Sequence, residues 1–139
     1  MSELLKILYV DDEEDIRAIV ELALGMDPDM DVVSSSSGGD ALRQIDQRGW
    51  MPDLAILDVM MPNMSGIELL AELRRREDTT SLPVVFITAS ARSAEVERNS
   101  VGAIGVTSKP FDVINFPSLV RKIYEASRAE EPSRPPGAG

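Results

Sequence analysis

The chain has 139 residues, of which 43% are hydrophobic, and this suits one compact domain with its own core. It contains no cysteine and no histidine, which excludes disulfides, thiol catalysis, serine-histidine triads and the usual zinc sites. A net charge of −10, without a local Lys/Arg cluster, argues against direct binding of nucleic acid. No run approaches the ~20 apolar residues of a membrane span and no signal peptide is recognisable, so we expect a cytoplasmic protein without membrane contact.

Five short apolar or β-branched runs, each bounded by turn residues, predict β-strands. They cover residues 4–10, 31–35, 53–57, 83–88 and 103–107. The segments between them place hydrophobic residues at helical spacing, so strands and helices alternate along the chain.

The helical segments differ in the strength of their pattern. The first is indicated by Ile16, Ile19, Val20, Ala23 and Leu24, the third by Ile67, Leu70, Ala71 and Leu73, and the last by Phe116, Leu119, Val120, Ile123 and Tyr124. Because Pro117 is tolerated only in a first turn, Asn115 is a better N-cap for the last helix than Asp112. Residues 91–101 carry few apolar anchors, so we expect the fourth helix to be short or mobile.

Alternating helices and apolar strands predict a parallel sheet that is covered on both faces, with right-handed crossovers. The predicted fold class is therefore α/β, in a doubly wound arrangement. We place the domain at residues 3–128. Residues 129–139 are rich in proline and glycine and are interpreted as a disordered tail or a truncated linker.

Polar side chains follow four of the predicted strands. Asp11 and Asp12 come after the first strand, Asp58 after the third, Thr88 ends the fourth, and Lys109 follows the fifth. In open parallel sheets the ligand crevice lies beyond the carboxyl ends of the strands. We therefore expect these five groups to converge on one edge of the sheet.

The convergence of acids on this edge points to a cation. Residues 13–15 are explained by the favourable interaction of acids with the first turn of a helix, but Asp11 and Asp12 facing Asp58 are not. Two like charges ~4 Å apart repel by about 4 kcal/mol at an effective dielectric of about 20. A shared Mg²⁺ or Mn²⁺ relieves this repulsion, because oxygen ligands suit these ions. Asp58 is then both ligand and nucleophile for a phosphoryl group, with Lys109 paired to a phosphoryl oxygen.

Four sequence motifs occur in a fixed order. They are Tyr-Val-Asp-Asp-Glu-Glu at 9–14, Asp-Val-Met-Met-Pro-Asn-Met-Ser-Gly at 58–66, Ile-Thr-Ala at 87–89 and Ser-Lys-Pro-Phe at 108–111. Over about residues 4–126 the chain resembles the receiver domains of two-component response regulators. The resemblance implies a flavodoxin-like, five-stranded sheet in the order 2-1-3-4-5 with five helices. It also implies a phosphorylation-dependent signalling switch, and not an enzyme with a separate substrate.

The resemblance implies a role for each acid of the edge. Asp58 is the phospho-acceptor, and its oxygens also contact Mg²⁺. Asp12 binds the ion directly, Asp11 supports it through water, and the backbone carbonyl of Met60 completes the protein ligands.

The resemblance also implies how the phosphoryl group is held. Lys109 bridges to it and forms a cis peptide bond with Pro110. Thr88 is the switch residue that moves to bond it, and Ala89 keeps access open. Many receivers carry an aromatic residue three positions before the lysine; here it is Val106, so no ring reports the movement of Thr88.

Family members receive the phosphoryl group from a histidine kinase or a histidine phosphotransfer protein. Because this chain has no histidine, the donor is another polypeptide or a small phosphodonor. The output is expected to be altered binding to a downstream protein, with a homodimer as a further possibility. Met60 and Ser90 place neither an acid nor an amide near an attacking water, so we expect only weak positional help for dephosphorylation.

Two other functions are considered. A phosphatase of the haloacid-dehalogenase class also forms an aspartyl-phosphate, but it carries a second Asp where this chain has Met60, and a cap insertion is missing. A receiver-like interaction module that is never phosphorylated is favoured by Val106 and opposed by the complete set of acids, threonine and lysine. We expect a stand-alone regulator in preference to a piece cut from a larger one.

Overall fold

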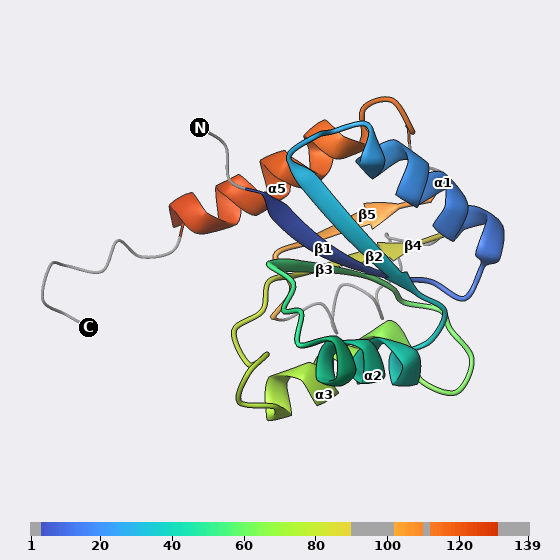
Figure 1. Cartoon of the computed structure of the whole chain (residues 1–139), viewed down its shortest axis with the longest axis vertical. Coiled ribbons are helices and arrows are strands. Elements are labelled where there is room, and N and C mark those ends of the chain that lie inside the picture. Colours follow the sequence, from blue (N-terminus) through green and yellow to red (C-terminus); the bar gives the residue numbers. More distant parts are fainter. Residues whose placement is uncertain (1–3, 90–101, 110–111, 131–139) are drawn as a thin grey trace, which may run out of the picture.

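The structure is a computed structural model that describes residues 4–89, 102–109 and 112–130. Its centre is a parallel sheet of five strands, β1 (Leu5–Val10), β2 (Met30–Ser35), β3 (Leu54–Asp58), β4 (Val84–Thr88) and β5 (Gly105–Ser108). The strands lie in the order β2-β1-β3-β4-β5 (Figure 1). This order confirms the predicted flavodoxin-like sheet.

Helices cover both faces of the sheet (Figure 1). Within the described ranges there are four: α1 (Glu14–Gly25), α2 (Gly38–Arg48), α3 (Gly66–Arg75) and α5 (Phe116–Glu130). Successive side chains of a strand point to opposite faces. In β1, Ile7 and Tyr9 therefore pack with α1 and α5, whereas Leu8 and Val10 pack with α2 and α3. Two hydrophobic cores result, which explains why the strands are apolar on both sides.

The register of the strands aligns their carboxyl ends. Val10 lies opposite Leu57, and Thr88 lies opposite Ser108. Asp58, the last residue of β3, lies opposite Ile87. The chain adds β2 on one side of β1 and β3 to β5 on the other, so the crevice of this fold is expected between the ends of β1 and β3.

The predicted strands agree with the observed strands within two residues at each end. α5 begins at Phe116, and the N–H of Leu119 donates to the carbonyl of Asn115 over 3.0 Å, as expected if Asn115 precedes the first turn. α5 continues to Glu130, so it includes the first two residues of the segment 129–139. The expected fourth helix, at 91–101, lies outside the described residues.

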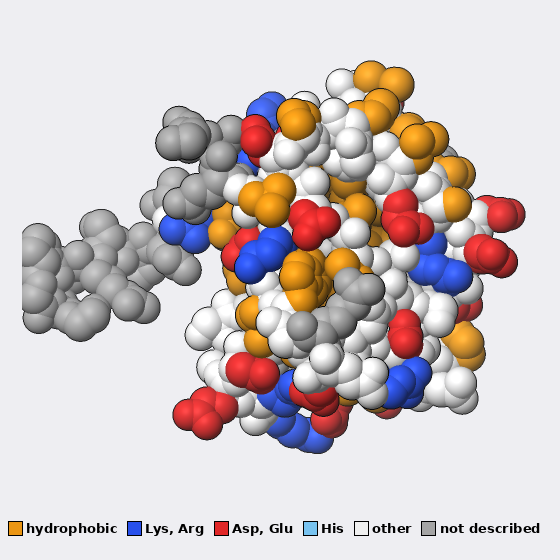
Figure 2. Space-filling model, viewed as in Figure 1, with side chains coloured by type: hydrophobic (Ala, Val, Ile, Leu, Met, Phe, Trp, Pro, Cys, Tyr) orange, Lys and Arg blue, Asp and Glu red, His pale blue; other side chains and the backbone are white. Residues whose placement is uncertain are grey.

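α1 confirms the helix that the spacing of its hydrophobic residues indicates, but these residues are not all buried. The side chain of Ile19 is 39% exposed, whereas Val20 and Leu24 are fully buried. Leu22 and Met26 are also exposed, and Figure 2 shows hydrophobic side chains gathered over this helix. α1 thus carries apolar residues on two sides, and spacing alone does not tell which side is buried. Among the described residues, no helix combines the length and apolar character that crossing a membrane demands.

Candidate functional site

Three carboxylates meet at the carboxyl edge of the sheet. Asp11 and Asp12 follow β1, and Asp58 ends β3. One oxygen from each lies within 4.8 Å of the other two. Asp11 and Asp58 are buried, with 0% and 3% of their surface exposed, whereas Asp12 is exposed. The edge therefore holds two acids away from water and a third that faces it.

Lys109 supplies the positive charge between these acids. Its ammonium Nζ lies 2.9 Å from Oδ2 of Asp11 and 3.4 Å from Oδ2 of Asp58. It also lies 2.9 Å from Oε1 of Glu13. Burial lowers the pKa of Lys109, but hydrogen bonds to Asp11 and Glu13 and the charge of Asp58 outweigh this, and the pKa lies above its usual range. Lys109 is therefore a cation that three carboxylates share.

Asp11 is fixed by several donors. Its Oδ1 accepts the backbone N–H of Glu13 over 2.9 Å, and its Oδ2 accepts the hydroxyl of Tyr9 over 2.7 Å. Arg17 donates to the carbonyl oxygen of Asp11 over 2.8 Å. Burial, the hydrogen bond to Asp11 and the neighbouring acids raise the pKa of Tyr9 above its usual range, so its hydroxyl stays a donor.

Asp58 sits in surroundings that oppose its ionisation. Burial and then the charge of Asp11 raise its pKa to about 7, although Lys109 and the backbone N–H of Met60 act in the opposite direction. That N–H donates to Oδ1 of Asp58 over 3.3 Å. Near neutral pH the metal-free carboxyl therefore exchanges readily between its protonated and ionised forms.

The start of α3 fixes the backbone that carries Asp58. The N–H of Gly66 donates to the carbonyl of Val59 over 3.1 Å. A Cβ at Gly66 would overlap the carbonyl oxygen of Asp58 and reach 3.1 Å from Cα of Val59, so only glycine allows this approach. Ser65 and Glu68 form a capping box, which satisfies N–H groups of the first turn of α3.

Thr88 and Lys109 are held side by side by β4 and β5. Thr88 ends β4 and is 1% exposed. Its carbonyl accepts the N–H of Lys109 over 2.9 Å. Val106, in β5, is half-buried and packs against the core formed with α2 and α3. The backbone ladder therefore places Thr88 and Lys109 side by side at the carboxyl edge of the sheet.

The structure brings together the residues that the sequence singles out. Asp11, Asp12, Asp58 and Lys109 form one cluster, and Thr88 lies next to Lys109 in the ladder. The predicted cis bond involves Pro110, which lies outside the described residues, as does Ser90.

Sequence reasoning missed three neighbours of the acids. From the sequence, Tyr9 is interpreted as a core residue of the first apolar run, and Glu13 as a residue of the first helical turn. Glu13 precedes α1 without a side-chain capping bond, and its carboxylate contacts Lys109 instead. A signal for Tyr9 was present, because residues two apart in an extended chain point the same way and Asp11 is two residues on. Arg17 had no such signal.

The donor set fits a small divalent ion. All three side chains offer carboxylate oxygens, the ligands that Mg²⁺ and Mn²⁺ prefer. Oxygens bound to one Mg²⁺ at about 2.1 Å can be at most about 4.2 Å apart. Three oxygens within 4.8 Å of each other need only a small adjustment to meet that limit.

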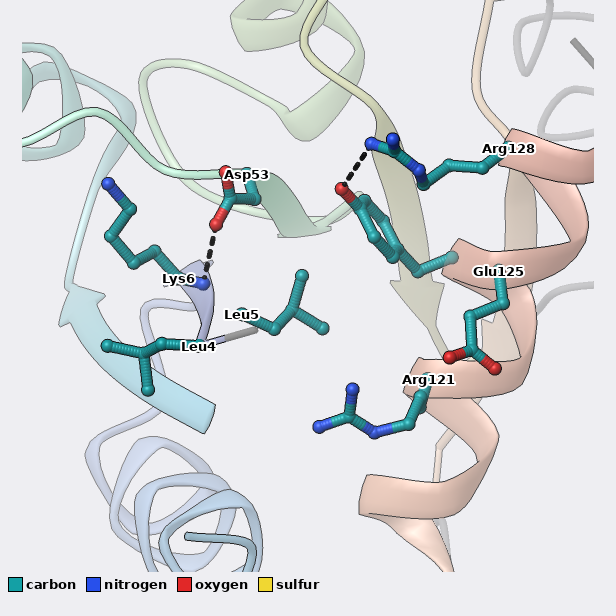
Figure 3. A pocket seen from close by; sticks show the side chains of 8 residues that line it. Leu4, Leu5, Lys6, Asp53, Arg121, Glu125 and Arg128 are labelled. Carbon is teal, nitrogen blue, oxygen red and sulfur yellow. Dashed lines mark hydrogen bonds between the residues drawn. The ribbon is translucent and has the colours of Figure 1, made fainter. Parts of the chain in front are cut away.

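A cavity of about 480 Å³ lies at the opposite end of the sheet (Figure 3). It is bounded by the start of β1, Asp53 and α5. Two pairs of its polar groups bond to each other: Asp53 accepts the backbone N–H of Lys6 over 2.9 Å, and Arg128 donates to the hydroxyl of Tyr124 over 3.0 Å. None of the strand-end groups lines it, so the acidic edge is the candidate site.

Fold and edge together define a class of protein: a doubly wound α/β domain with a carboxylate cluster and a lysine at the point where strand order reverses. The family model described as the response regulator receiver domain matches residues 7–121. The chain belongs to this family, whose members act in two-component signalling.

Several curated proteins are similar to the chain. The phosphate regulon transcriptional regulatory protein PhoB of Rhizobium meliloti is 34% identical over 128 residues, covering 91% of this chain and 54% of that protein. Response regulator Rre1 of a Synechocystis strain is 32% identical over 130 residues, covering 93% and 55%. A protein-glutamate methylesterase of Caulobacter vibrioides is 30% identical over 133 residues, covering 90% and 37%. The chain thus spans about half the length, or less, of these relatives.

Solved structures of similar fold include the chemotaxis protein CheY4 of Vibrio cholerae. It superposes with a TM-score of 0.77 at 28% identity, covering 86% of this chain and 98% of that chain. A CheY-like receiver domain from Methanospirillum hungatei has a TM-score of 0.78 at 24% identity, covering 92% and 99%, and this likeness supports the fold alone.

Proposed function

We propose that this receiver domain is switched by transfer of a phosphoryl group to Asp58, in the presence of Mg²⁺ or Mn²⁺. One observation carries the proposal: the ammonium of Lys109 lies between the buried carboxylates of Asp11 and Asp58, with an oxygen of Asp12 in reach. Such an edge concentrates negative charge that a divalent ion relieves, and it presents one acid as a nucleophile.

The carboxylates of Asp12 and Asp58 and the backbone carbonyl of Met60 would hold the ion directly, and Asp11 would support it through water. An ion held there would neutralise charge on the oxygens of the transferring phosphoryl group. Asp12 is the exposed member of the cluster, which suits an ion that arrives from solvent and keeps waters for exchange with phosphate.

The transfer uses Asp58 in its ionised form. A carboxylate oxygen of Asp58 attacks phosphorus of a phosphohistidine, so a P–O bond forms while the P–N bond breaks. The electron pair of the broken bond stays on the imidazole nitrogen of the donor, which can then take up a proton. The N–H of Met60 holds Oδ1 of Asp58 during this step.

Lys109 and Thr88 complete the site after transfer. Lys109 leaves its carboxylate partners and pairs with a phosphoryl oxygen, because a dianionic group attracts the ammonium more strongly than a shared carboxylate does. Thr88 donates its hydroxyl to another phosphoryl oxygen. The backbone hydrogen bond between Lys109 and Thr88 keeps these two residues next to each other. The side chain of Met60 is a thioether, which orients a water poorly, so we infer slow hydrolysis of the phosphoryl group.

The donor is a separate histidine kinase or histidine phosphotransfer protein, since this chain contains no histidine. The phosphoryl group then alters binding to a downstream protein, and the domain acts on no substrate besides its own aspartyl phosphate. A second candidate is an interaction module that is never phosphorylated. It is favoured by Val106, because valine has no aromatic ring that could become buried when Thr88 moves.

Labelling with acetyl phosphate tests the proposal. With Mg²⁺ present, intact-mass spectrometry is expected to show the gain of one phosphoryl group on the wild type and none on Asp58→Asn. Chelation of Mg²⁺ should abolish the gain. Equal labelling of Asp58→Asn would place the acceptor elsewhere, and a wild type that never gains mass would favour the interaction module.

A further inference from the structure

Tyr9 connects the acidic edge to the hydrophobic core. Its ring is fully buried in the core formed with α1 and α5. Its hydroxyl donates to Oδ2 of Asp11 over 2.7 Å. A buried tyrosine hydroxyl needs a partner, and any backbone carbonyl could serve. Here the partner is the most buried acid of the candidate metal site.

Three groups hold the carboxylate of Asp11, and they differ in how firmly they are placed. Oδ1 accepts the N–H of Glu13, which belongs to the backbone. Oδ2 is shared by the hydroxyl of Tyr9 and, at 2.9 Å, by the ammonium of Lys109. A ring packed in a core keeps its rotamer, whereas a lysine has four rotatable side-chain bonds.

The switch as proposed withdraws one of these groups. When Lys109 turns to a phosphoryl oxygen, Oδ2 of Asp11 loses the ammonium and keeps the hydroxyl of Tyr9. The hydrogen bond from Tyr9 then fixes the direction of the carboxylate and offsets part of its charge.

We propose that Tyr9 is a positioning residue of the metal site, which aims Asp11 at the ion while Lys109 is exchanged. The inference rests on the proposed function. Groups that orient a metal-binding side chain typically contribute about 10- to 100-fold to metal affinity. We expect the lower end of this range for Tyr9, because Asp11 acts through water and still accepts the hydrogen bond from the N–H of Glu13.

The two tyrosines of the chain provide a matched pair of variants. Tyr9→Phe removes one oxygen atom next to Asp11. Tyr124→Phe removes the same atom at the other end of the sheet, where the hydroxyl accepts a hydrogen bond from Arg128. Both variants keep the ring and hence the packing of the core.

The readout is the rate of labelling by acetyl phosphate at a series of Mg²⁺ concentrations. Tyr9→Phe is expected to raise the Mg²⁺ concentration for half-maximal rate about tenfold, and to leave the rate at saturating Mg²⁺ within about twofold of wild type. Tyr124→Phe should match wild type. If the two tyrosine hydroxyls had only a structural role, each variant would lose stability, and neither would change the Mg²⁺ concentration for half-maximal rate.

A double-mutant cycle with Asp11→Asn tests whether Tyr9 acts through Asp11. If it does, adding Tyr9→Phe to Asp11→Asn changes the Mg²⁺ dependence no further. Circular dichroism checks that each variant is folded. A variant that melts near the assay temperature is measured in the cold with sucrose, which favours the folded state.

The outcomes separate the two proposals. If the wild type is labelled and Tyr9→Phe shows the wild-type Mg²⁺ dependence, the role of Tyr9 is overturned and the proposed function stands. The role of Tyr9 is likewise overturned if Tyr9→Phe has a tenfold effect in both backgrounds, because the effect then bypasses Asp11. If the wild type is not labelled, the proposed function fails and the role of Tyr9 falls with it.

Discussion

At the scale of single residues, the described part of the site holds more carboxylates than ammonium groups. One ammonium, that of Lys109, contacts the carboxylates of Asp11, Glu13 and Asp58. The pKa of Asp58 is raised, first by burial and then by the charge of Asp11. Under the proposed function Asp58 attacks phosphorus as the ionised carboxylate, yet its surroundings without an ion favour the protonated form.

This conflict predicts a pH-dependent stability in metal-free buffer. In the unfolded chain Asp58 ionises near 3.8, and in the folded protein its pKa is about 7. The proton therefore stabilises the folded state fully below pH 3.8, and this contribution is lost as the pH rises through 7. Relative to Asp58→Asn, which does not titrate, the wild type should lose about 4 kcal/mol over this range, because each unit of pKa shift corresponds to about 1.4 kcal/mol.

Urea unfolding of both proteins with a chelator, at several pH values from 4 to 8, measures the difference. As a control, Glu125→Gln removes an exposed acid of α5 at the far end of the sheet. A gap between wild type and Asp58→Asn that stays constant across this range would show that Asp58 ionises normally.

The sequence predicts some of these residues and not others, for a physical reason. Asp11, Asp12, Asp58 and Lys109 stand directly after apolar runs, and parallel strands bring such positions to one edge whatever the details of packing. The contact of Glu13 with Lys109 joins residues 96 apart in the chain, and it depends on the direction that each side chain takes. No local pattern encodes that direction.

At the scale of elements, the position of Asp58 depends on the start of α3. The capping box of Ser65 and Glu68 sets where the helix begins, and Gly66 lets its first turn touch the end of β3. The alternation of strands and helices predicts both elements. It does not predict their close approach, because contact between a helix start and a strand end is set by packing of the whole α2 and α3 layer.

Replacing Gly66 by Ala tests this contact. The added methyl group would overlap the carbonyl oxygen of Asp58, so β3 or α3 must shift, at a cost of about 1–3 kcal/mol in the free energy of unfolding. The shift also moves the acceptor, so labelling by acetyl phosphate should slow.

Gly25→Ala is the matched control for Gly66→Ala. Gly25 ends α1, and a Cβ there would have no atom within 4 Å. Alanine favours the helix, so this variant should gain about 0.5–1 kcal/mol. Denaturant melts of both variants measure the effects. Equal stability of Gly66→Ala and wild type would mean that α3 does not constrain Asp58 as described.

At the scale of the whole molecule, the receiver fold collects charges that lie far apart in the sequence into one acidic edge. The chain carries a net charge of −10, and the two buried acids of the described residues, Asp11 and Asp58, lie at that edge. Binding of a divalent ion there should stabilise the folded state, because the unfolded chain scatters the same ligands. The three curated relatives described above are about twice as long or longer, so in them the receiver domain is only part of a larger protein.

The most direct test is a thermal melt of the domain with and without Mg²⁺, for wild type and Asp12→Asn. At a concentration 100 times the dissociation constant, Mg²⁺ should add about 2.7 kcal/mol to the free energy of unfolding and raise the wild-type melting temperature. Asp12→Asn should lose most of this rise. A wild-type melting curve that is the same with millimolar Mg²⁺ as with a chelator would contradict a shared ion at the acidic edge.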